Sequence, residues 1–353
     1  MATTPKTSAI ASSSIQSDDT VHQGFSRQDS RNTLLQLFGE DTLKQLSQRS
    51  NLWGAWALFS CWGIILLAMA AIVWAQSLEI YYAVPVIVAA IIIIAGRQLG
   101  LSILMHEASH RALFKNAWMN DYLADWLCGR PIFVEVGNYR KHHMIHHRET
   151  GTQDDIDYTL VKDFPTTRAS LFRKVLRDLI GITGLKALFG LSLMNAGYFK
   201  WTVANNIERL PRGNKHLGTY IVNFFKNAWP TLAVNGALYG IAVSIGHSEL
   251  FWAWVIAYLS PYQLFIRIRS LAEHAMTEQT PNMLKNTRST KAGCIARALV
   301  APYNVNYHIE HHAMPTVAFW QLPRLHKLLT DKKVVPTPPS YLQVLNMVSS
   351  KPV

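Results

Sequence analysis

The sequence predicts an all-α membrane protein, with four transmembrane helices in two hairpins and a cytoplasmic helical cap. Three observations lead to this fold class. The 353 residues are 49% hydrophobic and only 16% charged, whereas a soluble domain has about 25% charged residues. Long apolar runs occur in two pairs, each joined by a short connection. Between and after these pairs lie three clusters of histidines at helical spacings.

The first pair of apolar runs predicts a helical hairpin. Trp53–Ala75 contains no charged residue, and Ile80–Gly96 continues past Arg97 to Met105. Runs of about 20 residues match the length needed to cross a hydrocarbon core of about 30 Å. Only residues 76–79 separate the two runs, so the helices are expected to lie side by side.

The second pair predicts another hairpin of the same kind. Asn227–Ser248 and Leu250–Ile266 are apolar and flank Glu249 in a tight connection. Neither hairpin connection contains Lys or Arg, while the remaining loops are basic. The positive-inside rule therefore predicts that both termini and all three histidine clusters lie on the cytoplasmic side.

A further apolar segment, Leu179–Phe199, is interrupted only by Lys186. A membrane crossing here would place the first and third histidine clusters on opposite faces, where they could not form one site. We therefore expect an amphipathic helix that lies in the membrane interface.

The chain divides into three predicted regions. Residues 1–50 hold a disordered tail and an N-terminal amphipathic segment, because residues 1–30 are rich in Ser, Thr, Gln and Asp with few aliphatic residues. Residues 51–330 form the membrane domain. Residues 331–353 form a C-terminal tail, with a short extended stretch at Pro336–Pro339.

The charge and the cysteines exclude other classes of protein. The net charge is +12, and the basic residues flank the apolar runs, which favours a membrane surface. We expect no nucleic-acid partner, because no basic stripe alternates with polar base-reading residues. Cys61, Cys128 and Cys294 are too widely spaced for a Cys-x-x-Cys knuckle or a disulfide framework.

The histidine clusters have the spacing of metal ligands. Their sequences are His106-Glu-Ala-Ser-His110, His143-Met-Ile-His146-His147 with His142 before it, and His308-Ile-Glu-His311-His312. Offsets of three and four residues place imidazoles on one face of a helix. Imidazole is the commonest side-chain ligand of transition metals. One such pair arises often by chance, but three clusters together predict a metal site.

These clusters resemble the three histidine boxes of the integral-membrane fatty acid desaturase and hydroxylase superfamily. The boxes read His-x(3–4)-His, His-x(2–3)-His-His and His-x2-His-His, and the resemblance covers roughly residues 50–330. The surrounding sequences agree, in Arg140-Lys-His-His-Met-Ile-His-His-Arg148 and in Asn304-Val-Asn-Tyr-His-Ile-Glu-His-His-Ala-Met-Pro315. Unlike the fused members, this sequence has no recognisable cytochrome b5 domain.

The resemblance implies that the cap holds a di-iron site, completed by a further histidine after the fourth span. The matching segment here is Arg267-Ile-Arg-Ser-Leu-Ala-Glu-His274. Related proteins bring an Asn, four residues before that histidine, to one iron through water, and this chain has Ser270 instead. His142 lies outside the box spacing and is expected to support the site. The nine predicted ligands are His106, His110, His143, His146, His147, His274, His308, His311 and His312.

Ligand chemistry alone leaves the metal open among Zn, Cu, Ni and Fe, and the Irving–Williams order does not favour iron. Zinc sites use three or four protein ligands. Nine histidines are too many for one zinc and suit two metals with five or six ligands each and an open position. The resemblance favours iron.

Metal-bound imidazoles need their second nitrogen held by a carboxylate or carbonyl. We predict this supporting role for six residues near the boxes: Glu107, His142, Asp154, Asp157, Glu273 and Glu310. Glu149 and Asp155 could equally be solvated loop charges. The remaining histidines, His22, His216, His247 and His326, are expected away from the site.

The predicted reaction is O2-dependent desaturation of a fatty acyl chain or acyl lipid. The alternative is a lipid or carotenoid hydroxylase or ketolase with the same two irons. A zinc-dependent membrane hydrolase would need fewer ligands. A metal transporter would need ionisable residues inside the spans, and the runs contain essentially none apart from Arg97.

The electrons are expected from an external carrier such as ferredoxin, rubredoxin or cytochrome b5. Basic residues near the boxes could dock an acidic carrier: Arg140, Lys141, Arg148, Arg324, Lys327, Lys332 and Lys333. Equally, they could satisfy the positive-inside rule or hold lipid head groups. A bacterial inner membrane is favoured over the endoplasmic reticulum because the chain is compact and unfused.

Overall fold

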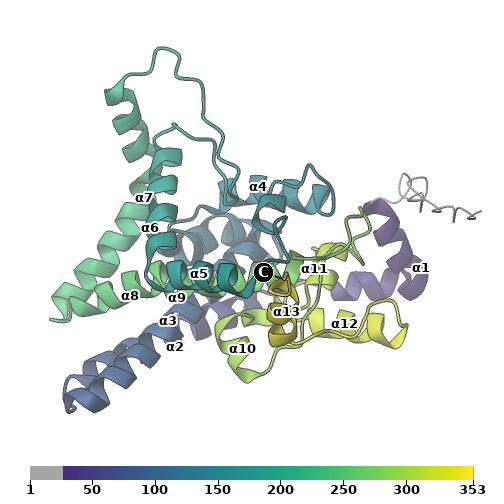
Figure 1. Cartoon of the computed structure of the whole chain (residues 1–353), viewed down its shortest axis with the longest axis horizontal. Helices are drawn as coiled ribbons and strands as arrows, with labels where there is room; N and C mark the ends of the chain where they lie inside the picture. Colours follow the sequence, from purple (N-terminus) through teal and green to yellow (C-terminus); the bar gives the residue numbers. More distant parts are fainter. Residues whose placement is uncertain (1–26, 353) are drawn as a thin grey trace, which may run out of the picture.

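The computed structural model describes residues 27–352 (Figure 1). Every regular element in this range is a helix, and β pairing is limited to isolated bridges, which confirms the all-α prediction. Most of the predicted disordered tail, including His22, lies outside the described residues. Its last four residues, 27–30, are helical and begin α1 (Arg27–Leu46).

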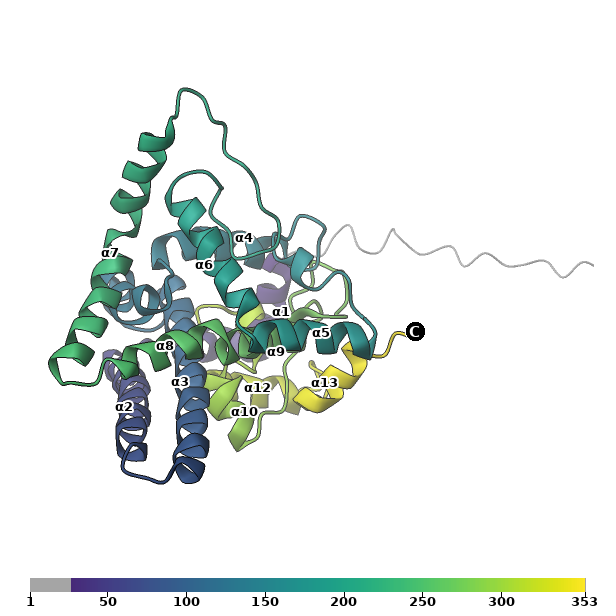
Figure 2. The same cartoon turned by 60° about the vertical axis from the view of Figure 1, so that its left-hand side comes forward.

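The first predicted hairpin is formed by α2 (Asn51–Ala75) and α3 (Ile80–Ser109). Ser50 begins α2, because its hydroxyl accepts a hydrogen bond from the backbone N–H of Trp53. Within the described residues, α2 and α3 are the helices long and apolar enough to cross a membrane. Figure 2 shows the hairpin projecting from the rest of the molecule.

Helix α3 joins the hairpin to the cap. Its 30 residues extend about 45 Å, well beyond a hydrocarbon core of about 30 Å. Residues near its start, such as Tyr81 and Val88, are exposed, whereas Leu99, Leu104 and Ala108 are fully buried. The C-terminal part of α3 is therefore the centre of the fold, and it contacts α2, α4, α8, α9 and α10.

The second predicted hairpin has a different form. Helix α7 (Leu217–Ser244) begins well before the predicted run, and the predicted fourth span is two helices, α8 (Glu249–Leu259) and α9 (Pro261–His274). The break lies at Ser260, where φ is −117° and ψ is −91°. Proline has no N–H to continue the helix and disfavours helical geometry in the residue before it. A single continuous fourth helix is therefore wrong.

The segment predicted to lie in the membrane interface, Leu179–Phe199, contains one short helix that follows a break at its start. Helix α5 (Arg168–Leu179) ends near Gly181, whose φ of +81° suits glycine, and α6 (Ile182–Asn195) follows. The 14 residues of α6 extend about 21 Å, too short to cross a membrane. The carboxylate of Asp178 accepts a hydrogen bond from Arg267 Nη2 at 2.9 Å and so ties α5 to α9.

Short elements complete the cap. They are the π-helices η1 (Met119–Leu123) and η2 (Asp125–Gly129), the 3-10 helices η3 (Arg130–Ile132), η4 (Tyr158–Leu160) and η5 (Pro302–Asn304), and the α-helices α4 (Val136–Glu149), α10 (Cys294–Leu299), α11 (His308–Ala313), α12 (Leu322–Asp331) and α13 (Tyr341–Val348). One apolar core joins α2, α3, α8 and α9, and a second joins α1, α11 and α12.

The predicted C-terminal tail is folded over much of its length. Ser340 and Gln343 form a capping box at the start of α13. The side chains of Val344 and Val348 are buried against the main core. The carbonyl of Val348 also accepts a hydrogen bond from the N–H of Thr166 at 2.8 Å, so the segment closes the cap.

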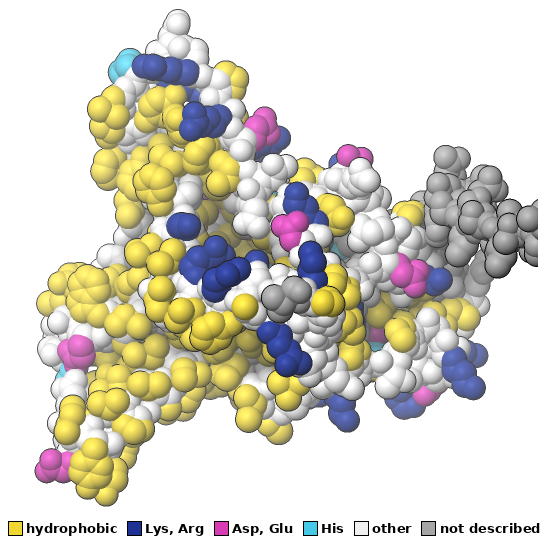
Figure 3. All heavy atoms as spheres, viewed as in Figure 1, with side chains coloured by type: hydrophobic (Ala, Val, Ile, Leu, Met, Phe, Trp, Pro, Cys, Tyr) yellow, Lys and Arg dark blue, Asp and Glu magenta, His cyan; other side chains and the backbone are white. Residues whose placement is uncertain are grey.

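Side chains of different kinds gather on different parts of the surface. In Figure 3, hydrophobic side chains cover the α2–α3 hairpin and the region of α6–α8, whereas Lys and Arg gather over α5 and the cap. Exposed Leu67 on α2 and exposed Ile241 on α7 are examples of the apolar part. Large exposed apolar surfaces mark contact with a membrane or another protein.

Candidate metal centre

Four helices bring the nine predicted ligand histidines together. The last turn of α3 carries His106, with His110 at its C-cap, and α9 ends at His274. Helix α4 carries the second cluster and α11 the third. Seven of the rings are buried, with at most 5% of their surface exposed: His106, His143, His146, His147, His308, His311 and His312.

The ring nitrogens form two adjacent groups. In the first, the ligand atoms of five histidines lie within 4.8 Å of one another: His106, His110, His143, His147 and His311. We call this group A. The second, group B, contains His146, His274 and His312, and His308 joins it because its Nε2 lies 2.9 Å from Nε2 of His274. The rings of His147 and His312, one from each group, stack with centroids 4.1 Å apart.

The arrangement fits metal ions better than a hydrogen-bond network. Nε2 of His147 lies 3.0 Å from Nε2 of His143 and 3.0 Å from Nε2 of His311. A neutral imidazole has one N–H, so three converging nitrogens leave lone pairs that point at one another. Nε2 of His106 and Nε2 of His312 are buried and make no hydrogen bond within residues 27–352. Such buried nitrogens normally need a partner, and a metal cation supplies one.

The pKa values of most of these histidines also favour metal binding. Burial lowers the pKa of His143, His147 and His312 well below the usual range, and neighbouring histidines lower it further. These rings are therefore neutral, which is the form that binds a metal. Burial also lowers the pKa of His146, but its hydrogen bond to Asp155 and the nearby carboxylate charges leave it raised.

Two aspartates support the second cluster from behind. Oδ1 of Asp157 lies 2.9 Å from Nε2 of His142, and Oδ1 of Asp155 lies 2.8 Å from Nδ1 of His146. His142 therefore contacts a carboxylate and lies outside both groups. The structure does not bring the side chain of Asp154 to a histidine within the described residues, because it is exposed. The backbone N–H of Asp157 donates to Oδ1 of Asp155 at 2.9 Å, a local turn that holds Asp155 inward.

Two glutamates lie close to histidine rings. Oε1 of Glu107 lies 3.4 Å from Nδ1 of His106, and Oε2 accepts a hydrogen bond from the N–H of Phe319 at 3.1 Å. Oε1 of Glu273 accepts from Nε of Arg269 at 2.8 Å, while Oε2 lies 3.6 Å from Nε2 of His308. Burial raises the pKa of Glu273 to about 7, although Arg269 acts to lower it.

Glu310 has a different set of partners. It accepts hydrogen bonds from Oγ of Ser289 and, at 2.6 Å, lies against Nδ1 of His326. His326 is one of the residues that we expected away from the site. The helical periodicity of α12 could have indicated that His326 faces the interior. It lies four residues after buried Leu322 and three before buried Leu329, on the same face of the helix.

The other two lone histidines within the described residues lie away from both groups. His216 precedes α7 and is exposed, and Nδ1 of His247 lies 2.7 Å from Oε1 of Glu249 in the α7–α8 connection. Both positions agree with the expectation from the sequence.

The basic residues near the boxes divide into two kinds. Arg140 is committed inside the protein, because its guanidinium donates to the carbonyls of Ser109 and Ala108 at 2.7 and 3.0 Å and pairs with Asp121. It holds the end of α3 against α4 and does not present a free surface charge. The others have exposed side chains: Lys141, Arg148, Arg324, Lys327, Lys332 and Lys333.

The fold and the centre define a class: an all-helical protein with an apolar hairpin and a buried histidine cluster able to bind metal. Residues 83–341 match the model of the fatty acid desaturase family. This match covers more than half of the chain, and the chain belongs to that family of oxidoreductase enzymes. The resemblance of the three histidine boxes is thereby confirmed.

Two relatives are similar over most of the same region. Dihydrorhizobitoxine desaturase of Bradyrhizobium elkanii is 25% identical over 247 residues, which cover 68% of this chain and 66% of the relative. The sn-1 acyl-lipid omega-3 desaturase (ferredoxin) of Nostoc sp. (strain 36) is 23% identical over 254 residues, which cover 68% and 65%. The matches thus span slightly less than two thirds of each relative.

Proposed function

We propose that this chain is a membrane-bound di-iron desaturase that introduces a double bond into a fatty acyl chain or acyl lipid. O2 is the co-substrate, and an external carrier supplies electrons. The observation that supports this most directly is the pair of adjacent groups of buried histidines at the inner end of an apolar helix, α3. Family membership supports it, both relatives are named as desaturases, and the name of the Nostoc relative includes an acyl lipid and ferredoxin.

Each group would hold one iron. Group A would supply five imidazoles and group B four, with Glu107 beside Nδ1 of His106 and Asp155 and Asp157 beside Nδ1 of His146. Glu273 instead approaches Nε2 of His308, the nitrogen that faces His274. When bound, the irons would supply the oxidant that an unactivated C–H bond requires. The protein buries the site, which keeps bulk water away from it, and burial favours the neutral form of rings such as His143, His147 and His312. At equal coordination number, the four histidines of group B would leave more positions for other ligands than the five of group A.

The hydroxylase and ketolase alternatives use the same residues, so the product decides between them. We expect purified protein, supplied with reductant, carrier and O2, to yield a product that has lost two hydrogens. Mass spectrometry of the acyl product measures this, and a gain of oxygen would establish hydroxylation instead. Metal analysis with Mössbauer spectroscopy should find two irons per chain, whereas a single zinc would overturn the di-iron assignment.

For the membrane arrangement, we propose four spans with the catalytic face in the cytoplasm of a bacterial cell. Helices α2 and α3 would be two spans, α7 the third, and α8 with the start of α9 the fourth. Exposed apolar residues on α7 and α8, such as Leu232, Ile241 and Trp252, support the second pair. Helix α5 exposes Phe172 and Leu176 beside arginines, which suits the interface.

Cysteine labelling tests this arrangement. An impermeant thiol reagent added outside intact cells should label Ser77→Cys and Ser248→Cys, since both positions lie in the hairpin connections. It should not label Ala169→Cys at the exposed start of α5. The background is Cys294→Ser, because Cys294 is an exposed cysteine. Labelling of Ala169→Cys from outside would overturn the topology.

A further inference from the structure

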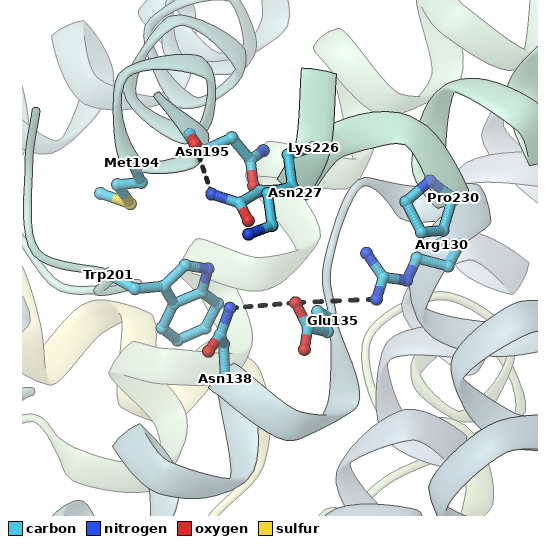
Figure 4. Close-up of a pocket in the computed structure, with 9 residues that line it drawn as sticks. All are labelled: Arg130, Glu135, Asn138, Met194, Asn195, Trp201, Lys226, Asn227 and Pro230. Carbon is cyan, nitrogen blue, oxygen red and sulfur yellow. Dashed lines mark hydrogen bonds and ion pairs between the residues drawn. The ribbon is translucent and has the colours of Figure 1, made fainter. Parts of the chain in front are cut away.

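A polar pocket lies next to the metal centre and is not explained by it. Its volume is about 410 Å³, and residues of η3, α4, α6, α7 and the segment that connects α6 to α7 line it. Figure 4 shows Lys226 and Asn227 reaching in from α7, opposite Glu135 and Asn138, with the Trp201 ring on one side.

The pocket adjoins the second histidine box. Asn138 and His142 lie one turn apart on the same face of α4, about 6 Å along its axis. The ring of Trp201, which lines the pocket, packs edge-on against the ring of His142 with centroids 5.7 Å apart. Trp201, His142 and Asp157 thus form a chain of contacts from the pocket to His146 of group B.

The pocket contains both signs of charge. Arg130 is neutralised by Asp125, whose Oδ2 accepts a hydrogen bond from its Nε at 2.7 Å. Lys226 makes no hydrogen bond or ion pair with another residue of the described range, so its charge is available to a ligand. Glu135 accepts a hydrogen bond from Asn138 at 3.0 Å, and its Oε2 also lies 3.6 Å from Nη2 of Arg130, but its side chain remains 37% exposed. Two cations and two carboxylates give no net charge.

This arrangement of charges favours one class of ligand. A polyanionic head such as a nucleoside diphosphate needs several unpaired cations, and the pocket offers one. A head with a phosphate and an ammonium matches what is present: Lys226 for the phosphate, and Glu135 with the face of Trp201 for the ammonium.

The surroundings place the pocket at the level of lipid head groups. Lys226 lies between Phe225 and Trp229, which are 57% and 55% exposed. Aromatic residues concentrate at the membrane–water interface, and lysines there extend toward water. Further along α7 an apolar groove of about 440 Å³ follows, lined by Ala237 and Ile241 among others. The polar pocket and the apolar groove along one helix suit an amphiphile.

We propose that this pocket binds the zwitterionic head group of a phospholipid, with its phosphate on Lys226 and its ammonium between Glu135 and Trp201. The inference rests on the proposed acyl-lipid function and names the substrate class as a zwitterionic diacyl lipid instead of an acyl thioester.

Binding of short-chain lipids to the purified full-length protein tests this, without reductant or O2, so that turnover plays no part. We expect dihexanoyl phosphatidylethanolamine to bind about tenfold more tightly than dihexanoyl phosphatidylglycerol, which lacks the ammonium. Lys226→Met should weaken both lipids about tenfold, and Lys226→Arg should restore them. Glu135→Gln should weaken phosphatidylethanolamine alone, to the level of phosphatidylglycerol. Lys186→Met, at an exposed lysine of α6 outside the pocket, is the matched control.

Equal affinity for the two lipids, wild-type affinity in Lys226→Met, or tighter binding of hexanoyl-CoA than of either lipid would overturn the proposal. A failure of the proposed function looks different, because the same preparation would bind phosphatidylethanolamine as expected and give no desaturated product.

Discussion

Groups A and B contain similar rings that are held in different ways. In group A a carboxylate approaches one ring, with Oε1 of Glu107 at 3.4 Å from Nδ1 of His106, and aromatic packing orients two others. The ring of Tyr139 stacks on His143 with centroids 5.1 Å apart, and His147 stacks on His312 of group B. In group B, carboxylates lie beside the rings, with Asp155 at 2.8 Å from His146 and Glu273 at 3.6 Å from His308.

The difference teaches how a buried site can fix several equivalent ligands. A carboxylate fixes the tautomer of a ring and raises its basicity, whereas stacking fixes only its plane. Group A has five nitrogens around one centre and can tolerate looser orientation of each. Group B has four, so each ring must be held more firmly. The following predictions separate the two cases.

The largest effect is expected from removing a ligand. His147→Ala in group A and His312→Ala in group B should each abolish desaturation and lower the iron content, because each deletes one imidazole from a centre. Iron analysis and product analysis on the purified variants measure both. His247→Ala, in the α7–α8 connection, serves as the control. Near-normal turnover in either ligand variant would show that the groups do not form one catalytic centre.

The next largest effect is expected at Asp155. Asp155→Ala removes the acceptor that holds Nδ1 of His146, and loss of such support costs about 10- to 100-fold in metal affinity or activity. Asp154→Ala is the matched control, since the adjacent side chain is exposed and should be silent. Equal effects of the two substitutions would assign the loss to the loop and not to the carboxylate.

Stacking in group A should matter less. Tyr139→Leu removes the aromatic face against His143, and such a contact is worth about 0.5–1.5 kcal/mol beyond its buried area. We expect a few-fold loss of activity with both irons retained, visible as a changed Mössbauer signal of one iron. Tyr122→Leu, at an exposed position of η1, should leave the spectrum as in the wild type. Loss of iron from Tyr139→Leu would show that iron binding by group A depends on the support of its rings as strongly as in group B.

Much of this architecture was predictable from local pattern. The continuous apolar run from Ile80 and the spacing of the boxes predicted α3 and the faces of α4 and α11, because both depend only on helical periodicity. The division of the fourth span was visible as Ser260-Pro261, but average hydropathy does not register a proline. Ser340 and Gln343 likewise have the spacing of a capping box, which indicates the start of a helix in the region that we predicted as a tail.

The supporting residues were harder to predict because they depend on tertiary geometry. Asp154 and Asp155 are neighbours of the same chemistry, and only the turn after α4 decides which one faces His146. Glu310 lies between two ligand positions in sequence, yet its partners are Ser289 and His326. Which carboxylate reaches which ring is set by how α11 and α12 pack, and spacing within one helix does not contain that information.

The smallest effect is expected from the surface charges that could receive an electron carrier. Lys327 and Lys332 are exposed near α11, whose His308 and His312 belong to group B. Complementary charge chiefly raises the association rate and is screened over about 8 Å at physiological salt. Lys327 already pairs with Asp331 at 2.8 Å, but exposed pairs of this kind contribute little.

Charge reversal by Lys327→Glu with Lys332→Glu should therefore lower turnover several-fold at limiting ferredoxin, and saturating ferredoxin should restore it. The wild-type rate at limiting ferredoxin should also fall as salt rises. Lys141→Glu on α4 is the comparison, because it changes a similar exposed charge beside the second box. If Lys141→Glu alone reproduces the effect, the carrier docks over α4, and if neither variant changes the dependence on ferredoxin, these charges serve the membrane surface.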